Sequence, residues 1–116
     1  MKRQVAEASG RRAEDAAASW LEEQGWTIRD RRRKTPLGEI DLVVSRPGMV
    51  AFIEVKYRRK AKDLDLAIDE HRLRRVAAAA ESVAHEHAAG GEDIRIDVIL
   101  LAPGQPPRHI ANAWMP

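Results

Sequence analysis

This chain has 116 residues and no cysteine, which suits one domain and excludes disulfides and thiolate metal sites. Hydrophobic residues make up 44% of the chain and charged residues 33%, a balance that excludes a wholly disordered protein. No apolar run approaches the roughly 20 residues that cross a bilayer, so we expect a single cytoplasmic domain over residues 1–116 without membrane contact.

The first expected element is a helix over residues 11–24, where apolar side chains from Ala13 to Leu21 recur at helical spacing. Gly25 is typical of the position that ends a helix, because glycine readily adopts the left-handed conformation needed there. Residues 1–9 are expected either to be flexible or to extend this helix.

Three strands are expected next. Residues 26–29 alternate apolar and polar side chains, as a first strand does. The basic run and the Thr-Pro pair over residues 31–36 predict a loop, and residues 37–44 predict the second strand. A Pro-Gly turn over residues 46–48 leads into a third strand over residues 49–56. The short gap between the last two strands predicts an antiparallel hairpin.

The second half of the chain predicts one long helix and two strands. A polar stretch over residues 57–65 precedes an alanine-rich helix over residues 66–88. Residues 94–101 are mostly apolar, which favours a central strand, and residues 109–114 predict a short edge strand. We therefore expect an α/β domain in the order α-β-β-β-α-β-β, with a mixed central sheet of four to five strands flanked by two main helices.

Acidic residues interrupt the otherwise apolar second strand. Because side chains alternate along a strand, Glu39 and Asp41 are expected on one face, with Ile40 and Leu42 on the other. In the third strand, the same rule places Glu54 and its neighbour Lys56 on one face. If the two strands pair, the charged faces can meet.

Grouped carboxylates in apolar strands are costly to bury, because they repel one another unless a cation lies between them. Mg²⁺ or Mn²⁺ would resolve this conflict, with Asp41 and Glu54 as ligands and the carbonyl of Val55 as a third oxygen donor. Lys56 would then lie beside a metal-bound water and help to activate it. The alternative is an exposed hairpin that carries ordinary Glu–Lys pairs across its strands.

The motifs GEIDL over residues 38–42 and FIEVKYR over residues 52–58 resemble the YraN-like family of small bacterial proteins of unassigned function. That family in turn resembles restriction-endonuclease-like PD-(D/E)xK nucleases, and most closely the archaeal Holliday junction resolvases. The resemblance extends over about residues 10–114, and its other matching segments are 10–14, 67–69, 72–75, 95–99 and 109–113. It implies a restriction-endonuclease-like fold and a nuclease-like domain.

The resemblance also implies roles for individual residues. Asp41 matches the metal-binding Asp of the superfamily, and Glu54 with Lys56 matches its Glu-x-Lys pair. Glu14 matches a helical Glu that completes the catalytic site in related resolvases. One departure affects DNA contact, since Arg72 stands where the family usually has Lys.

For three acidic residues the sequence allows two alternative roles each. Glu14 borders the apolar stripe of the first helix, so it reaches the metal site or remains a surface residue. Glu39 either supports the metal ligands from beside them or pairs with a basic side chain, and we favour the pairing. Asp97 interrupts the 94–101 strand, where we favour a buried, hydrogen-bonded residue over a metal ligand.

Basic residues around these motifs are expected to bind nucleic-acid phosphates, although each is also a common surface charge. They are Arg32, Arg33, Lys34, Arg58, Arg59, Arg72 and Arg75. Together with the metal site they predict an Mg²⁺- or Mn²⁺-dependent endonuclease that acts on DNA, including branched or structured DNA. A homodimer would supply the two sites that cutting a junction requires. The alternatives are a DNA-binding module with this fold and little catalysis, and a protein-interaction domain.

Overall fold

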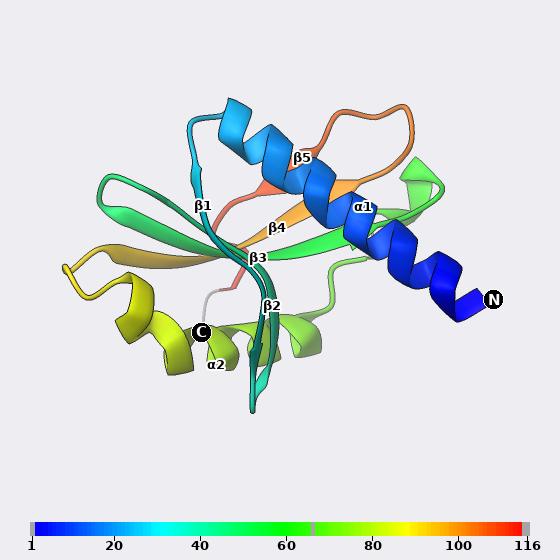
Figure 1. The fold of residues 1–116 in the computed structure, drawn as a ribbon. Helices are drawn as coiled ribbons and strands as arrows, with labels where there is room; N and C mark the ends of the chain where they lie inside the picture. The colour runs from blue at the N-terminus through cyan, green and yellow to red at the C-terminus, as the bar shows by residue number, and fades with distance from the viewer. Residues whose placement is uncertain (1, 66, 115–116) are drawn as a thin grey trace.

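The computed structural model describes the backbone of residues 2–65 and 67–114, and within these ranges the side chains from residue 10 onward. Five strands form one mixed sheet in the order β1-β2-β3-β4-β5, with α1 and α2 on opposite faces (Figure 1). The elements are α1 (Lys2–Glu23), β1 (Thr27–Thr35), β2 (Gly38–Arg46), β3 (Met49–Tyr57), the 3₁₀ turn η1 (Ala61–Asp63), α2 (Glu70–His87), β4 (Asp93–Leu101) and β5 (Arg108–Ile110). The predicted α/β class and element order are confirmed.

Strand direction follows from the lengths of the connections. The short turns β1–β2 and β2–β3 join antiparallel neighbours, so the predicted hairpin is confirmed. β3 and β4 are parallel, and α2 lies in the long crossover that parallel pairing requires. β4 is an interior strand and β5 is a short edge strand, as their sequences predicted.

Each helix covers one face of the sheet with a separate apolar cluster. Ala17 and Leu21 of α1 pack with Leu42 of β2, while Leu73 of α2 packs with Phe52 of β3. The predicted stop of α1 at Gly25 is confirmed, with a φ of 96° at that glycine. The N–H of the next residue donates to Leu21 O at 3.0 Å, so the helix end is satisfied by a Schellman-type turn.

Three predicted boundaries were wrong. The last strand was expected over residues 109–114, but β5 ends at Ile110 and residues 111–112 form a turn. Residues 31–35 continue β1 and are not a loop. Among the described residues β1 pairs only with β2, and an edge strand tolerates charged side chains because they reach solvent. α2 begins at Glu70 and leaves residues 67–69 outside the helix, because Asp69 caps it by accepting hydrogen bonds from the N–H groups of His71 and Arg72. Residue 66, where the predicted helix began, lies outside the described residues.

The feature that positions the site is a fork between β2 and β3. The two strands pair only from Arg46–Met49 to Leu42–Ile53. Beyond the Leu42–Ile53 pair, β2 stays with β1 as far as Gly38, while β3 stays with β4 as far as Tyr57. Figure 1 shows the β1–β2 ribbon bending away from β3 at this point.

The bend breaks the expected alternation along β2. Ile40 lies in the α2-side core and Leu42 in the α1-side core, so the prediction that they share a face was wrong. On β1 the backbone of Arg32 is left-handed, with a φ of 52°, between the paired residues Arg31 and Arg33. A left-handed residue within a strand twists the ribbon locally, and here it lies opposite Asp41, between the Arg31–Leu42 and Arg33–Ile40 pairs.

Candidate metal centre

Three carboxylates meet at the fork. One oxygen atom from each of Glu14, Glu39 and Asp41 lies within 4.8 Å of the other two. Glu14 comes from α1, and the other two come from the part of β2 that has left β3. We refer to these three residues as the carboxylate cluster. Of the two readings of Glu14, the structure therefore favours the one in which it reaches the site.

Asp41 is the most buried member of the cluster, at 7% exposure. Its Oδ2 accepts a hydrogen bond from the Val55 N–H at 2.8 Å, so the side chain spans the gap where backbone pairing has ended. Burial raises the pKa of Asp41 to about 7, and the negative charges of Glu54 and Glu14 act in the same direction. Ionisation of Asp41 is therefore costly, both because the carboxylate is buried and because it lies near other negative charges.

Glu14 is half-buried between the other two carboxylates of the cluster and the guanidinium of Arg32. Burial raises the pKa of Glu14, as does the charge of Glu39, while Arg32 opposes both. The Arg32 Nε lies 3.4 Å from Glu14 Oε1. Within the described residues Glu39 forms no ion pair, so the basic partner that we favoured for it is not found there.

Glu54 lies across the fork but turns its carboxylate toward cations. It is 2% exposed, and its Oε1 lies 3.3 Å from Lys56 Nζ and 3.2 Å from Arg72 Nε. Its Oε2 is buried and has no hydrogen-bond partner among the described residues. The predicted common face of Glu54 and Lys56 is confirmed, whereas the three-oxygen cluster forms without Glu54.

Val55 also faces the fork with its backbone. Its N–H donates to Asp41, and in a strand the N–H and C=O of one residue point to the same neighbouring strand. The carbonyl oxygen of Val55 is therefore directed toward the side on which Asp41 lies, as an oxygen ligand there would have to be.

The basic residues expected at phosphates divide into two groups. Arg32 and Arg72 contact the acidic residues of the fork directly, through Glu14 and Glu54. Arg72 and Arg75 also line a hollow of about 240 Å³ beside Glu39.

The second group lies outside these contacts. Arg33 pairs with Glu86 of α2 at 2.6 Å, and Arg58 donates to the backbone O of Tyr57 at 2.7 Å. Lys34 and Arg59 are exposed and form no ion pair within the part of the chain that the structure describes.

Asp97 is a fully buried structural residue, as favoured from the sequence. Arg95 donates to both of its oxygens, at 2.8 and 2.9 Å, and His109 Nε2 lies 2.7 Å from Oδ2. The N–H of Asn112 donates to Oδ1 at 2.9 Å, which ties β4 to the turn after β5. Burial alone would raise the pKa of Asp97, but the hydrogen bonds from His109, Arg95 and Asn112 lower it.

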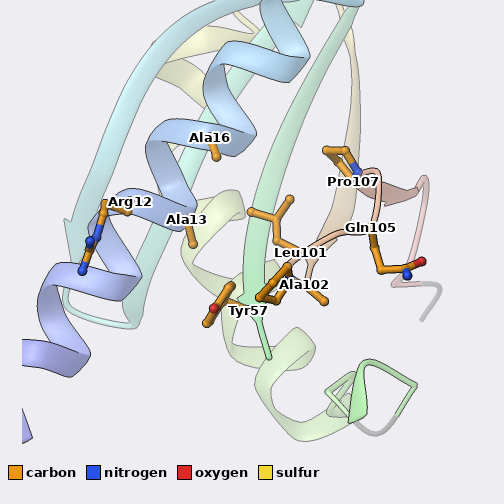
Figure 2. Close-up of a pocket in the computed structure, with 9 residues that line it drawn as sticks. Arg12, Ala13, Ala16, Tyr57, Leu101, Ala102, Gln105 and Pro107 are labelled. Atoms are coloured by element: carbon orange, nitrogen blue, oxygen red, sulfur yellow. The ribbon is translucent and has the colours of Figure 1, made fainter. Parts of the chain in front are cut away.

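A pocket of about 500 Å³ lies next to the fork and was not expected from the sequence. Figure 2 shows it between α1, the ends of β3 and β4, and the loop that carries Gln105 and Pro107. Tyr57 and Arg12 belong to its wall. In the sequence, the one signal for it is an aromatic residue, Tyr57, directly after Lys56.

The arrangement suits a hard divalent cation. The donors are carboxylate oxygens, which Mg²⁺ and Mn²⁺ prefer, and the repulsion among them is what a doubly charged ion would relieve. Lys56 and Arg72 supply positive charge at the other side of the fork, where an anionic substrate would be stabilised.

None of the helices in the described ranges has the length and apolarity that crossing a bilayer requires.

Comparisons with known proteins identify the family. The chain is similar to the UPF0102 proteins of Erythrobacter litoralis (65% identity) and Sphingopyxis alaskensis (59%), in both cases over 116 residues and the full length of each chain. It is 49% identical to that of Rhizorhabdus wittichii over 113 residues, 97% of this chain and 96% of the relative. A family model matches residues 13–101, and the chain therefore belongs to the uncharacterised protein family UPF0102, the YraN-like family that its motifs indicated.

Proposed function

We propose that this chain is a divalent-metal-dependent endonuclease that hydrolyses DNA phosphodiester bonds with a single nuclease-like domain. The observation that carries the proposal is the meeting of Glu14, Glu39 and Asp41 at the fork, where burial and the negative charges of Glu54 and Glu14 raise the pKa of Asp41 to about 7. A buried Asp41 and a half-buried Glu14 that both have a raised pKa are typical of a functional site, because stability alone does not favour them.

The donors at the fork fit Mg²⁺ or Mn²⁺. Glu14, Glu39 and Asp41 would hold the ion, with the Val55 carbonyl and the unpartnered Oε2 of Glu54 as further oxygen donors. When bound, such an ion polarises a phosphate and lowers the pKa of a coordinated water.

The cations of the fork complete the chemistry. Glu54 holds Lys56 and Arg72 at 3.3 and 3.2 Å, which fixes the direction of both side chains. Lys56 Nζ would donate to the attacking water or to a phosphate oxygen, and the planar guanidinium of Arg72 would bind two phosphate oxygens. Removing either partner from Glu54 would leave a buried carboxylate less well compensated.

The surrounding basic residues support DNA as the substrate. Arg75 lies beside the cluster, and Arg58 and Arg59 follow Lys56 along the chain, so positive charge continues outward from the fork. Contacts of this kind hold the backbone and do not read bases. The resemblance to junction resolvases supports branched or structured DNA, and a homodimer would bring two such sites to one junction.

The experiment is a cleavage assay on labelled duplex, single-stranded and branched DNA with Mn²⁺, Mg²⁺ or EDTA. We expect cleavage only with a divalent ion, and a loss of at least about 100-fold for Asp41→Asn and Lys56→Met. Asp15→Asn is the matched control, since Asp15 follows Glu14 on α1 but pairs with Arg31 at the surface. Metal-dependent cleavage that survives Asp41→Asn would refute the proposal.

One observation favours a second candidate, a DNA-binding module with little catalysis. Glu54 is already paired with Lys56 and Arg72, so positive charge at the fork is available to phosphates without a metal ion. This candidate predicts salt-dependent DNA binding in EDTA that Asp41→Asn does not weaken, and no cleavage with any divalent ion. Cleavage that Asp41→Asn abolishes would exclude it.

A further inference from the structure

The pocket beside the fork lies next to chain segments that carry part of the proposed reaction centre. Two of its wall residues, Ala13 and Tyr57, directly adjoin Glu14 and Lys56 in the chain. It lies on the α1 side of the sheet, where α1, the ends of β3 and β4 and the loop after β4 surround it (Figure 2). A group bound there would therefore lie close to the segment of α1 that carries Glu14.

The chemistry of the wall suits a nucleotide. Leu101, Ala102 and Ala16 are apolar, and Tyr57 adds an aromatic ring that is 36% exposed. Every nucleobase has a face that stacks on such a ring. Arg12 adds a positive charge at the wall, which matches the phosphate that follows each base.

The size of the pocket agrees with this occupant. About 500 Å³ is within the range of roughly 300 to 1,000 Å³ of pockets that bind small molecules and cofactors. A base within a duplex is stacked between its neighbours and cannot enter, whereas an unpaired or extruded base can.

We infer that this pocket receives one unpaired nucleotide of the DNA strand whose phosphate lies at the fork. The inference rests on the proposed function and narrows its substrate class to DNA that carries an unpaired nucleotide beside the cleaved bond. Tyr57 would stack on the base, and Arg12 would contact an adjacent phosphate.

The test measures binding by fluorescence anisotropy in EDTA, so that cleavage does not interfere. The probes are three otherwise identical duplexes: one with a single bulged 2-aminopurine, one with an abasic bulge, and one fully paired. We expect the bulged base to bind about tenfold more tightly than the abasic bulge, because stacking is lost without the base. The 2-aminopurine fluorescence should be quenched when the protein binds.

Substitutions in the pocket wall test whether the difference in affinity between the bulged base and the abasic bulge arises in the pocket. Tyr57→Leu should abolish the tenfold difference and the quenching, while Tyr57→Phe should retain both. Ala16→Phe fills the pocket from an exposed helix position and should also abolish the difference. Ser19→Phe, one turn further along α1 and outside the pocket, is its matched control and should retain it.

The outcomes separate this inference from the proposed function. Equal affinity for the bulged base and the abasic bulge, in a protein that still cleaves DNA with Mn²⁺, would overturn the inference alone. The same holds if Tyr57→Leu and Ala16→Phe retain the difference. A wild-type protein that neither binds nor cleaves any of the three duplexes would overturn the proposed function and the inference with it.

Discussion

The raised pKa of Asp41 has a measurable consequence for stability. An Asp whose ordinary pKa is 3.8 has a pKa of about 7 in the folded protein, so the folded state holds this proton more tightly than the unfolded state does. The contribution of the protonated carboxyl is fully present below about pH 4 and is lost as the pH rises through 7. Without metal, the free energy of unfolding should therefore fall across this range.

The size of the effect follows from the shift. One pKa unit corresponds to about 1.4 kcal/mol, so a rise of roughly three units costs about 4 kcal/mol at pH 8. Asp41→Asn removes the titration and keeps an oxygen that accepts the Val55 N–H. In EDTA at pH 8 the variant should be more stable than the wild type by up to about 4 kcal/mol, and near pH 4 the two should be equal.

The assay is urea unfolding followed by circular dichroism at several pH values, in EDTA and with Mn²⁺. The difference in free energy of unfolding between variant and wild type removes the contribution of groups that titrate alike in both proteins. With Mn²⁺ at 100 times its dissociation constant, the wild type should gain about 2.7 kcal/mol and Asp41→Asn much less.

Two results would refute this reasoning. The first is a difference between variant and wild type that stays constant from pH 4 to pH 8, since it would mean that the Asp41 carboxylate is not destabilised by its surroundings. The second is equal stabilisation of both proteins by Mn²⁺, which would place the ion elsewhere.

Two further predictions concern residues away from the fork. Asp97→Asn should lower the free energy of unfolding at pH 7 by about 3 kcal/mol, because Arg95 and His109 lose a buried anionic partner. The lowered pKa of Asp97 gives stability that is present above its ordinary pKa and lost in acid, so urea unfolding at pH 2.5 should show a smaller difference. Asp69→Ala should cost about 1 kcal/mol in the same assay, since the N–H groups of His71 and Arg72 lose their cap, and an unchanged midpoint would contradict the capping role.

Local chemistry explains the features that the sequence predicted well. The order of helices and strands follows from hydrophobic periodicity, the stop at Gly25 from its positive φ, and the β2–β3 hairpin from a short turn. Asp41 and Glu54 stood out in the sequence because charge within apolar strands requires a partner, and the structure gives them the Val55 N–H and the cations of Lys56 and Arg72. The role of Asp97 followed in the same way.

Contacts between distant segments decided what the sequence did not reveal. Residues 31–35 form a strand because β2 offers them a partner after it leaves β3. The left-handed Arg32 and the fork change which face Ile40 takes, which no period-two rule foresees. The packing of α1 on the sheet brings Glu14 to Asp41 and Glu39, and the packing of α2 brings Arg72 to one oxygen of Glu54. The sequence of a strand determines which charges it carries. Only the packing of the helices and the divergence of the strands determine which of those charges meet.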